Sequence, residues 1–124
     1  MATVLVGYVP KPEGEAALTR AIEEALLRKA QLLVISAHRN REGAAPDLTE
    51  VRAQLESSGV DYHLREVADG GDVADELVQN AVDSGAELLV IGLRRRTPVG
   101  KLILGSNAQR VLLDAPCPVL AVKG

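Results

Sequence analysis

Residues 72–92, DVADELVQNAVDSGAELLVIG, place an amphipathic segment directly before a continuous apolar run. Asp72 is a residue type that caps helix N-termini, and the residues after it carry an apolar stripe at helical spacing. That stripe consists of Val73, Leu77, Val78 and Ala81. Residues 87–92 indicate a strand buried on both faces, because their apolar side chains are continuous rather than alternating. A helix that leads into such a strand is typical of a parallel α/β sheet.

The same alternation continues on both sides of this stretch. Apolar runs predict further strands over residues 3–9, 31–37, 60–67 and 118–123, and the run 60–67, which alternates less cleanly, is placed nearer an edge. Amphipathic segments between the strands predict helices over residues 13–29, 47–59 and 106–114. We therefore predict one α/β domain over residues 1–124, a doubly wound open sheet of about five parallel strands in the order 3-2-1-4-5 with helices on both faces.

Composition argues against several classes of protein. The net charge is −3, and the aromatic residues are two Tyr with no Trp or Phe, so there is neither an overall positive charge nor a set of stacking platforms for nucleic acid. No apolar run approaches the ~20 residues that span a bilayer, and the first apolar run has no basic residue before it. The single cysteine, Cys117, suits a reducing compartment. We expect a cytoplasmic protein without nucleic-acid or membrane partners.

The predicted strand order also predicts where a ligand would bind. In doubly wound sheets, ligands bind beyond the carboxyl ends of the strands, where the order reverses. For the order 3-2-1-4-5 this crevice lies between the first and fourth strands. Its walls would be the loop after Val9 and the loop after Gly92.

A loop rich in glycine and basic residues follows the fourth predicted strand, where residues 92–106 read GLRRRTPVGKLILGS. Gly92 ends that strand at a place where a side chain would crowd a ligand over the sheet, and Gly105 lets the backbone approach an anion closely. Ser106 opens a helix, where free N–H groups and the helix dipole favour a phosphate. The loop adds positive charge through Arg94, Arg95, Arg96 and Lys101.

Each of these features also has an explanation without a ligand. Ser106 and Gln109 have the S-x-x-Q spacing of a capping box, which stabilises a helix by itself. A run of arginines is usually a solvated surface, and Gly92 would equally suit a plain strand end. The hypothesis of a binding site rests on two glycines and a helix start falling at one predicted crevice.

The C-terminal part of the chain resembles the universal stress protein family. That family carries Gly, two residues, Gly, nine residues, Gly and then Ser or Thr, and this chain has Gly92, Arg95 in the second position, nine residues, and Gly105-Ser106. Residues 114–120, DAPCPVL, are similar to the family's ending. The resemblance implies a five-stranded parallel sheet, frequent homodimers, and binding of ATP or AMP in many members but not in all.

The resemblance also implies positions for the ligand. Phosphate contacts would fall at Gly92, Arg95, Gly105, Ser106 and Asn107, and ribose and adenine contacts near Tyr8, Val9 and Ala37. The chain departs from the family at residues 9–11, which read Val-Pro-Lys where an aspartate followed by Gly and Ser is usual. It departs again at Arg95, which would either bind the phosphates through its guanidinium or block the groove, and we favour binding.

Two function hypotheses follow. The first is a stress-response or regulatory protein, not an enzyme, that binds ATP or AMP, with or without Mg²⁺. Gly100-Lys101 is followed by Leu102 instead of the hydroxyl residue of a Walker A motif, and we identify no catalytic residue and no metal site, so at most slow ATP hydrolysis is expected. The alternative is a dimeric interaction module without nucleotide, a homodimer paired through the apolar last strand between Val119 and Val122.

Overall fold

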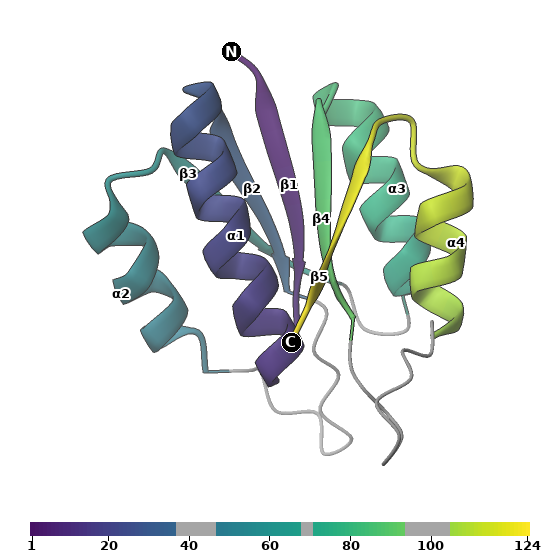
Figure 1. Ribbon diagram of the computed structural model, residues 1–124, viewed down its shortest axis with the longest axis horizontal. Helices are drawn as coiled ribbons and strands as arrows, with labels where there is room; N and C mark the ends of the chain where they lie inside the picture. Colours follow the sequence, from purple (N-terminus) through teal and green to yellow (C-terminus); the bar gives the residue numbers. More distant parts are fainter. Residues whose placement is uncertain (37–46, 68–70, 94–104) are drawn as a thin grey trace.

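The structure, a computed structural model, describes residues 1–36, 47–67, 71–93 and 105–124. Within these ranges, strands and helices alternate along the chain (Figure 1). They are β1 (Thr3–Tyr8), α1 (Pro12–Arg28), β2 (Gln31–Ser36), α2 (Thr49–Ser58), β3 (Tyr62–Glu66), α3 (Val73–Ser84), β4 (Leu88–Leu93), α4 (Ser106–Asp114) and β5 (Val119–Lys123). The strands are parallel and form one sheet in the order β3-β2-β1-β4-β5, which confirms the predicted topology.

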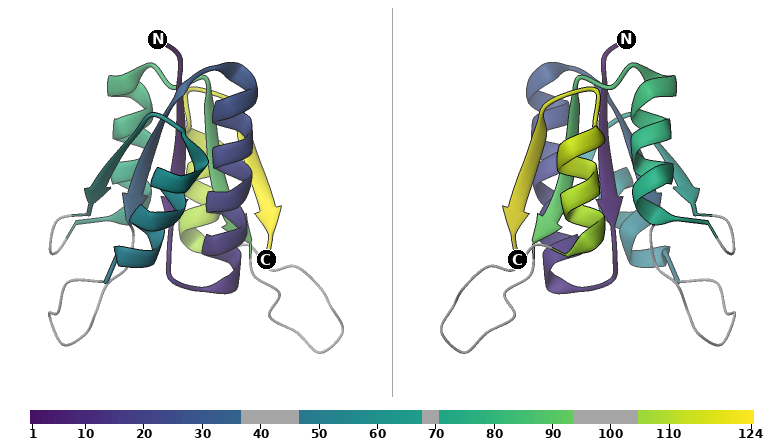
Figure 2. Two further views of the ribbon diagram at one scale, coloured as in Figure 1. Left: turned by 90° about the vertical axis from the view of Figure 1, so that its left-hand side faces the viewer. Right: turned by 90° about the vertical axis from the view of Figure 1, so that its right-hand side faces the viewer.

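The central strands are covered on both faces by separate apolar layers. Val4 and Val6 of β1 belong to the layer beneath α1 and α2, whereas Leu5 belongs to the layer beneath α3 and α4. Figure 2 shows these two pairs of helices on opposite sides of the sheet. Burial on both sides explains why β1, β2 and β4 are continuously apolar in the sequence.

The helix ends agree only in part with the predicted caps. Asp72 caps α3 as predicted, with its carboxylate accepting a hydrogen bond from the Asp75 amide at 3.1 Å. The expected capping box of Ser106 and Gln109 is wrong: Gly105 is the N-cap of α4, and no side chain caps it. Ser106 is already the first residue of the helix, one position too late for its hydroxyl to act as the cap.

The helix predicted over residues 47–59 begins two residues later, at Thr49, and Leu48 is its N-cap residue. The Asp47 carboxylate accepts a hydrogen bond from the Thr49 amide at 3.0 Å. Gly59 ends the helix in the left-handed conformation, with φ of 77°, which glycine adopts readily.

Within the described ranges, no helix combines the length and the apolar composition that crossing a bilayer requires.

Candidate functional site

A pocket lies at the carboxyl ends of β1 and β4, where the strand order reverses. β1 and β4 are neighbours in register, with Val6 opposite Val90, so the segments that follow both strands meet at one edge of the sheet. The pocket has a volume of about 270 Å³. Its walls are Val9, Lys11 and Glu13 after β1, Gly92 and Leu93 of β4, and Gly105, Asn107 and Ala108 around the start of α4.

A second, smaller hollow of about 140 Å³ adjoins this pocket beneath α3 and α4. It shares Val9, Gly92, Asn107 and Ala108 with the pocket, and its other walls are Gly7, Val73, Leu77, Ile91 and Val111. The two spaces therefore form a charged compartment, whose walls include Lys11 and Glu13, and an apolar compartment. Such a pairing suits a ligand that has one charged end and one apolar end.

The structure gives Gly92 a different role from the one expected. Gly92 lies within β4, opposite Val122 of β5, and does not end the strand. A Cβ atom at Gly92 would lie 2.2 Å from the backbone oxygen of Glu13, so a side chain there would collide with the first turn of α1. Gly92 is thus explained by the packing of α1 on the sheet, and it presents only backbone to the pocket.

Gly105 has no such explanation among the described residues. Its φ of −70° is available to any residue, and a Cβ atom there would meet none of the described residues within 4 Å. Gly105 precedes the first turn of α4, where the backbone N–H groups have no partner within the helix and the helix dipole is positive. None of the described side chains near Gly105 would keep an anion from these amides.

Arg110 holds the first half of α4 against α3. Its guanidinium bridges Asp72, at 2.9 Å, and Asp75. The Asp75 amide and, after it, the Arg110 charge lower the pKa of Asp72, so this carboxylate stays ionised to a lower pH than an ordinary aspartate does. Because these side chains are roughly half exposed, the ion pairs align the two helices more than they stabilise the fold.

The predicted site residues fall into three groups. Val9, Gly92, Gly105 and Asn107 line the pocket. Ser106 is exposed at the start of α4 but belongs to neither compartment, and Tyr8 belongs to neither as well. Ala37 and Arg95 lie outside the described residues.

Tyr8 lies on the other face of the sheet from the apolar hollow. Its side chain is buried in the layer beneath α1 and α2. Burial, and then the negative charges of Glu15 and Glu50, raise the pKa of its phenol. The geometry therefore gives Tyr8 a place in the core and no contact with either compartment.

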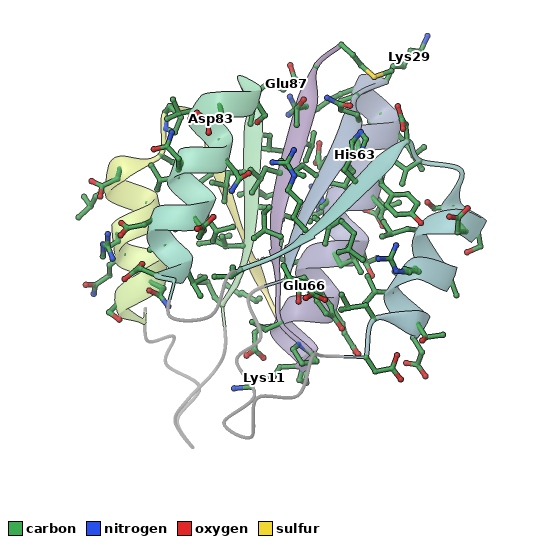
Figure 3. All side chains as sticks on the ribbon, turned by 180° about the vertical axis from the view of Figure 1, so that it is seen from behind. Lys11, Lys29, His63, Glu66, Asp83 and Glu87 are labelled. Atoms are coloured by element: carbon green, nitrogen blue, oxygen red, sulfur yellow. The ribbon has the colours of Figure 1, made fainter. Side chains whose placement is uncertain are left out.

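Two charged wall residues were missing from the sequence-based site, namely Lys11 and Glu13. Lys11 is the N-cap residue of α1 and Glu13 lies in its first turn. Figure 3 shows Lys11 at the carboxyl edge of the sheet, whereas Lys29, at the other end of α1, lies at the opposite edge. The sequence did offer a signal for these two residues. Lys11 and Glu13 come just after the first predicted strand, and the turn that follows this strand forms one wall of the crevice.

The described residues contain no group of three or more His, Cys, Asp or Glu side chains arranged to hold a metal ion.

Comparison with known proteins agrees with this architecture. The family model "Universal stress protein family" matches residues 1–123. A universal stress protein of Mycolicibacterium smegmatis is 46% identical, over 97% of this chain and 96% of that protein. The solved structure of a universal stress protein from Archaeoglobus fulgidus aligns with a TM-score of 0.75 at 30% identity, covering 99% of this chain and 98% of that one.

A crystal structure of a universal stress protein in complex with cAMP aligns with a TM-score of 0.74 at 29% identity, covering 98% of this chain and 95% of that one. The match extends over both walls of the pocket as well as the sheet, since it covers nearly the whole chain. The chain belongs to the universal stress protein family.

Proposed function

We propose that this protein is a regulatory, non-enzymatic protein that binds an adenine nucleotide, ATP or AMP, at the carboxyl ends of β1 and β4. The observation that carries the proposal is the pocket that opens onto the free first turn of α4. A helix N-terminus favours a phosphate through its unpaired amides and its dipole. The related protein solved with cAMP shows that a chain of this family and fold accommodates an adenine nucleotide.

The phosphate would lie in the charged compartment. Gly105 and Asn107 present the start of α4, and Gly92 presents backbone from β4. Ser106 would contribute through its amide, since its side chain does not line the pocket. Arg95 remains a proposed phosphate ligand on the basis of the family resemblance.

The nucleoside would extend from the phosphate over the end of β1. Val9 lines both compartments and is the proposed contact for the ribose and base. Ala37, which lies outside the described residues, remains a proposed contact on the basis of the family resemblance. The apolar hollow beneath α3 and α4 gives a flat apolar group room to enter next to Val9. Tyr8 supports this site from the core beneath α1 and α2 instead of touching the ligand.

Isothermal titration of the purified protein with ATP and AMP, each with and without Mg²⁺, tests the proposal. We expect saturable heat with at least one nucleotide, and weaker binding of adenosine, which has the base but no phosphate for the start of α4. Absence of heat with either nucleotide at millimolar concentration would refute nucleotide binding.

A second candidate function, a homodimer that acts as an interaction module, is favoured by the exposed edge of β5. β5 pairs with β4 on one side and is the last strand of the sheet. Its sequence is VLAVK, and its apolar residues are only partly buried. The opposite edge strand, β3, carries YHLRE, whose charged residues discourage strand pairing. We propose that β5 pairs with β5 of a second copy, which is compatible with nucleotide binding.

Ala121→Pro should convert such a dimer into a monomer without unfolding the protein. Gly124 donates its amide to Leu93 of β4, so in the alternating ladder the amide of Ala121 points away from β4, toward the free edge. Proline there removes a donor that only a second copy would use. Light scattering should show half the mass of the wild type, with circular dichroism unchanged.

Val122→Pro is the matched control for this change. Its amide points toward β4, so the substitution breaks a bond of the native ladder and should lower the melting temperature. A wild-type protein that is already monomeric at micromolar concentration would contradict the dimer. So would a dimer that persists in a folded Ala121→Pro variant.

A further inference from the structure

The turn between β1 and α1 places two opposite charges on one wall of the pocket. Lys11 and Glu13 both line the charged compartment, and the start of α4 forms another of its walls. Neither forms an ion pair with another residue in the described part of the chain. An anion in the pocket would therefore meet one attractive and one repulsive side chain on the same wall.

The backbone of this wall is held in place by close packing. Lys11 donates its amide to Val9 at 2.8 Å, and Pro12 fixes the first helical position of α1. A Cβ atom on Gly14 would lie 1.8 Å from the oxygen of Val9, so the helix rests directly on the end of β1. Gly92 also approaches α1 closely, since a Cβ atom on Gly92 would lie 2.2 Å from the Glu13 oxygen. The wall cannot withdraw from a bound anion without displacing α1.

Among the described wall residues, Lys11 favours negative charge in the pocket and Glu13 opposes it. One phosphate between the first turn of α4 and the Lys11 ammonium is favoured from both sides. Each further phosphate adds negative charge in the same compartment, where Glu13 repels it. A monophosphate carries about two negative charges and a triphosphate about four, so the repulsion grows with the length of the phosphate chain.

We propose that Lys11 and Glu13 set the charge specificity of the site: Lys11 binds one phosphate opposite α4, and Glu13 disfavours longer phosphate chains. In the absence of divalent cations, Glu13 then shifts the preference of the site from ATP toward AMP. This inference rests on the proposed function, because it concerns how the same pocket discriminates between nucleotides.

The test compares the dissociation constants of AMP and ATP in buffer with EDTA at low ionic strength. Glu13→Gln should lower the dissociation constant of ATP about three- to tenfold, as expected for the removal of a partly screened charge. The dissociation constant of AMP should change by no more than about twofold. Lys11→Gln should weaken both nucleotides by about tenfold, since it removes the contact to the first phosphate.

Matched controls separate charge in the pocket from charge elsewhere. Glu15→Gln removes a carboxylate from the same first turn of α1, but Glu15 does not line the pocket. Lys29→Gln removes a lysine from the other end of α1. Both controls should bind AMP and ATP as the wild type does, and urea unfolding should show that all variants are folded.

The outcomes distinguish this inference from the proposed function. If the wild type binds neither nucleotide, both fail. If the wild type binds but the ratio of ATP to AMP affinity is the same in Glu13→Gln, only the role of Glu13 is wrong. An equal change in Glu15→Gln would assign the effect to overall charge and overturn the inference, and unaltered AMP binding in Lys11→Gln would remove Lys11 from the site.

Discussion

Gly92→Ala should lower the free energy of unfolding by about 3 kcal/mol or more, a large loss for a domain of this size. The added methyl group would lie 2.2 Å from the backbone oxygen of Glu13 and 2.6 Å from its carbonyl carbon. Backbone atoms cannot rotate away as the end of a flexible side chain can. The first turn of α1 would have to lift from the sheet, which disturbs the helix that covers β1 and β4.

Urea unfolding followed by circular dichroism measures this effect, with Gly105→Ala as the control. A methyl group at Gly105 meets no described residue within 4 Å, so only a weaker N-cap preference changes, which costs about 1 kcal/mol or less. If the Gly92→Ala protein were as stable as the Gly105→Ala protein, α1 would not pack against β4 as described. If that stable Gly92→Ala variant had also lost affinity for nucleotide, glycine at this position would serve ligand binding instead of packing, as the sequence analysis expected.

The two glycines show where sequence reasoning reaches its limit. Both stood out for the same reason, since glycine permits close approach to a backbone. The sequence does not say what approaches. At Gly92 it is α1, which is distant from β4 in the chain, and at Gly105 none of the described residues lies within 4 Å of an added Cβ atom. Only the packing of helix on sheet separates a structural glycine from one that is open to a ligand.

The fold was predictable because its signals are local and repeated. Leu89 and Val90 belong to a continuous apolar run that suits a strand with helices on both faces. Asp72 and Gly59 mark helix ends through their own conformational preferences. The cap of α4 was misplaced by one residue because glycine and serine are both good N-cap residues, and they are adjacent at Gly105 and Ser106.

The candidate site was predictable in place but not in all its members. The reversal of strand order locates the crevice, and Val9 and Gly105 follow from it. Lys11 and Glu13 have no motif of their own, and they reach the pocket only because the turn after β1 folds across the edge of the sheet. Tyr8 was assigned by its position along the chain, but the alternation of β1 turns its side chain to the other face.

Gly105→Asp should raise stability and weaken nucleotide binding. These opposite effects make it the sharpest test of whether a phosphate binds at the start of α4. Aspartate is a preferred N-cap residue, and its charge complements the helix dipole, so the free energy of unfolding should rise by about 0.5 kcal/mol. The same carboxylate would occupy the position proposed for a phosphate and repel it. The affinity for AMP should therefore fall by at least about tenfold, even after allowance for solvent screening.

Gly105→Asn separates charge from size in this experiment. Asparagine has nearly the shape of aspartate and is an equally good N-cap residue, but it is neutral. Its AMP affinity should fall by no more than about threefold, since what remains is a small steric cost without charge repulsion. Calorimetry with AMP on the wild type and both variants, with melting temperatures measured in parallel, gives the comparison. The Gly105→Asp protein could prove more stable and yet bind AMP as tightly as the Gly105→Asn protein does. That result would mean that no phosphate binds at the first turn of α4, because a carboxylate and a phosphate cannot share the same amides.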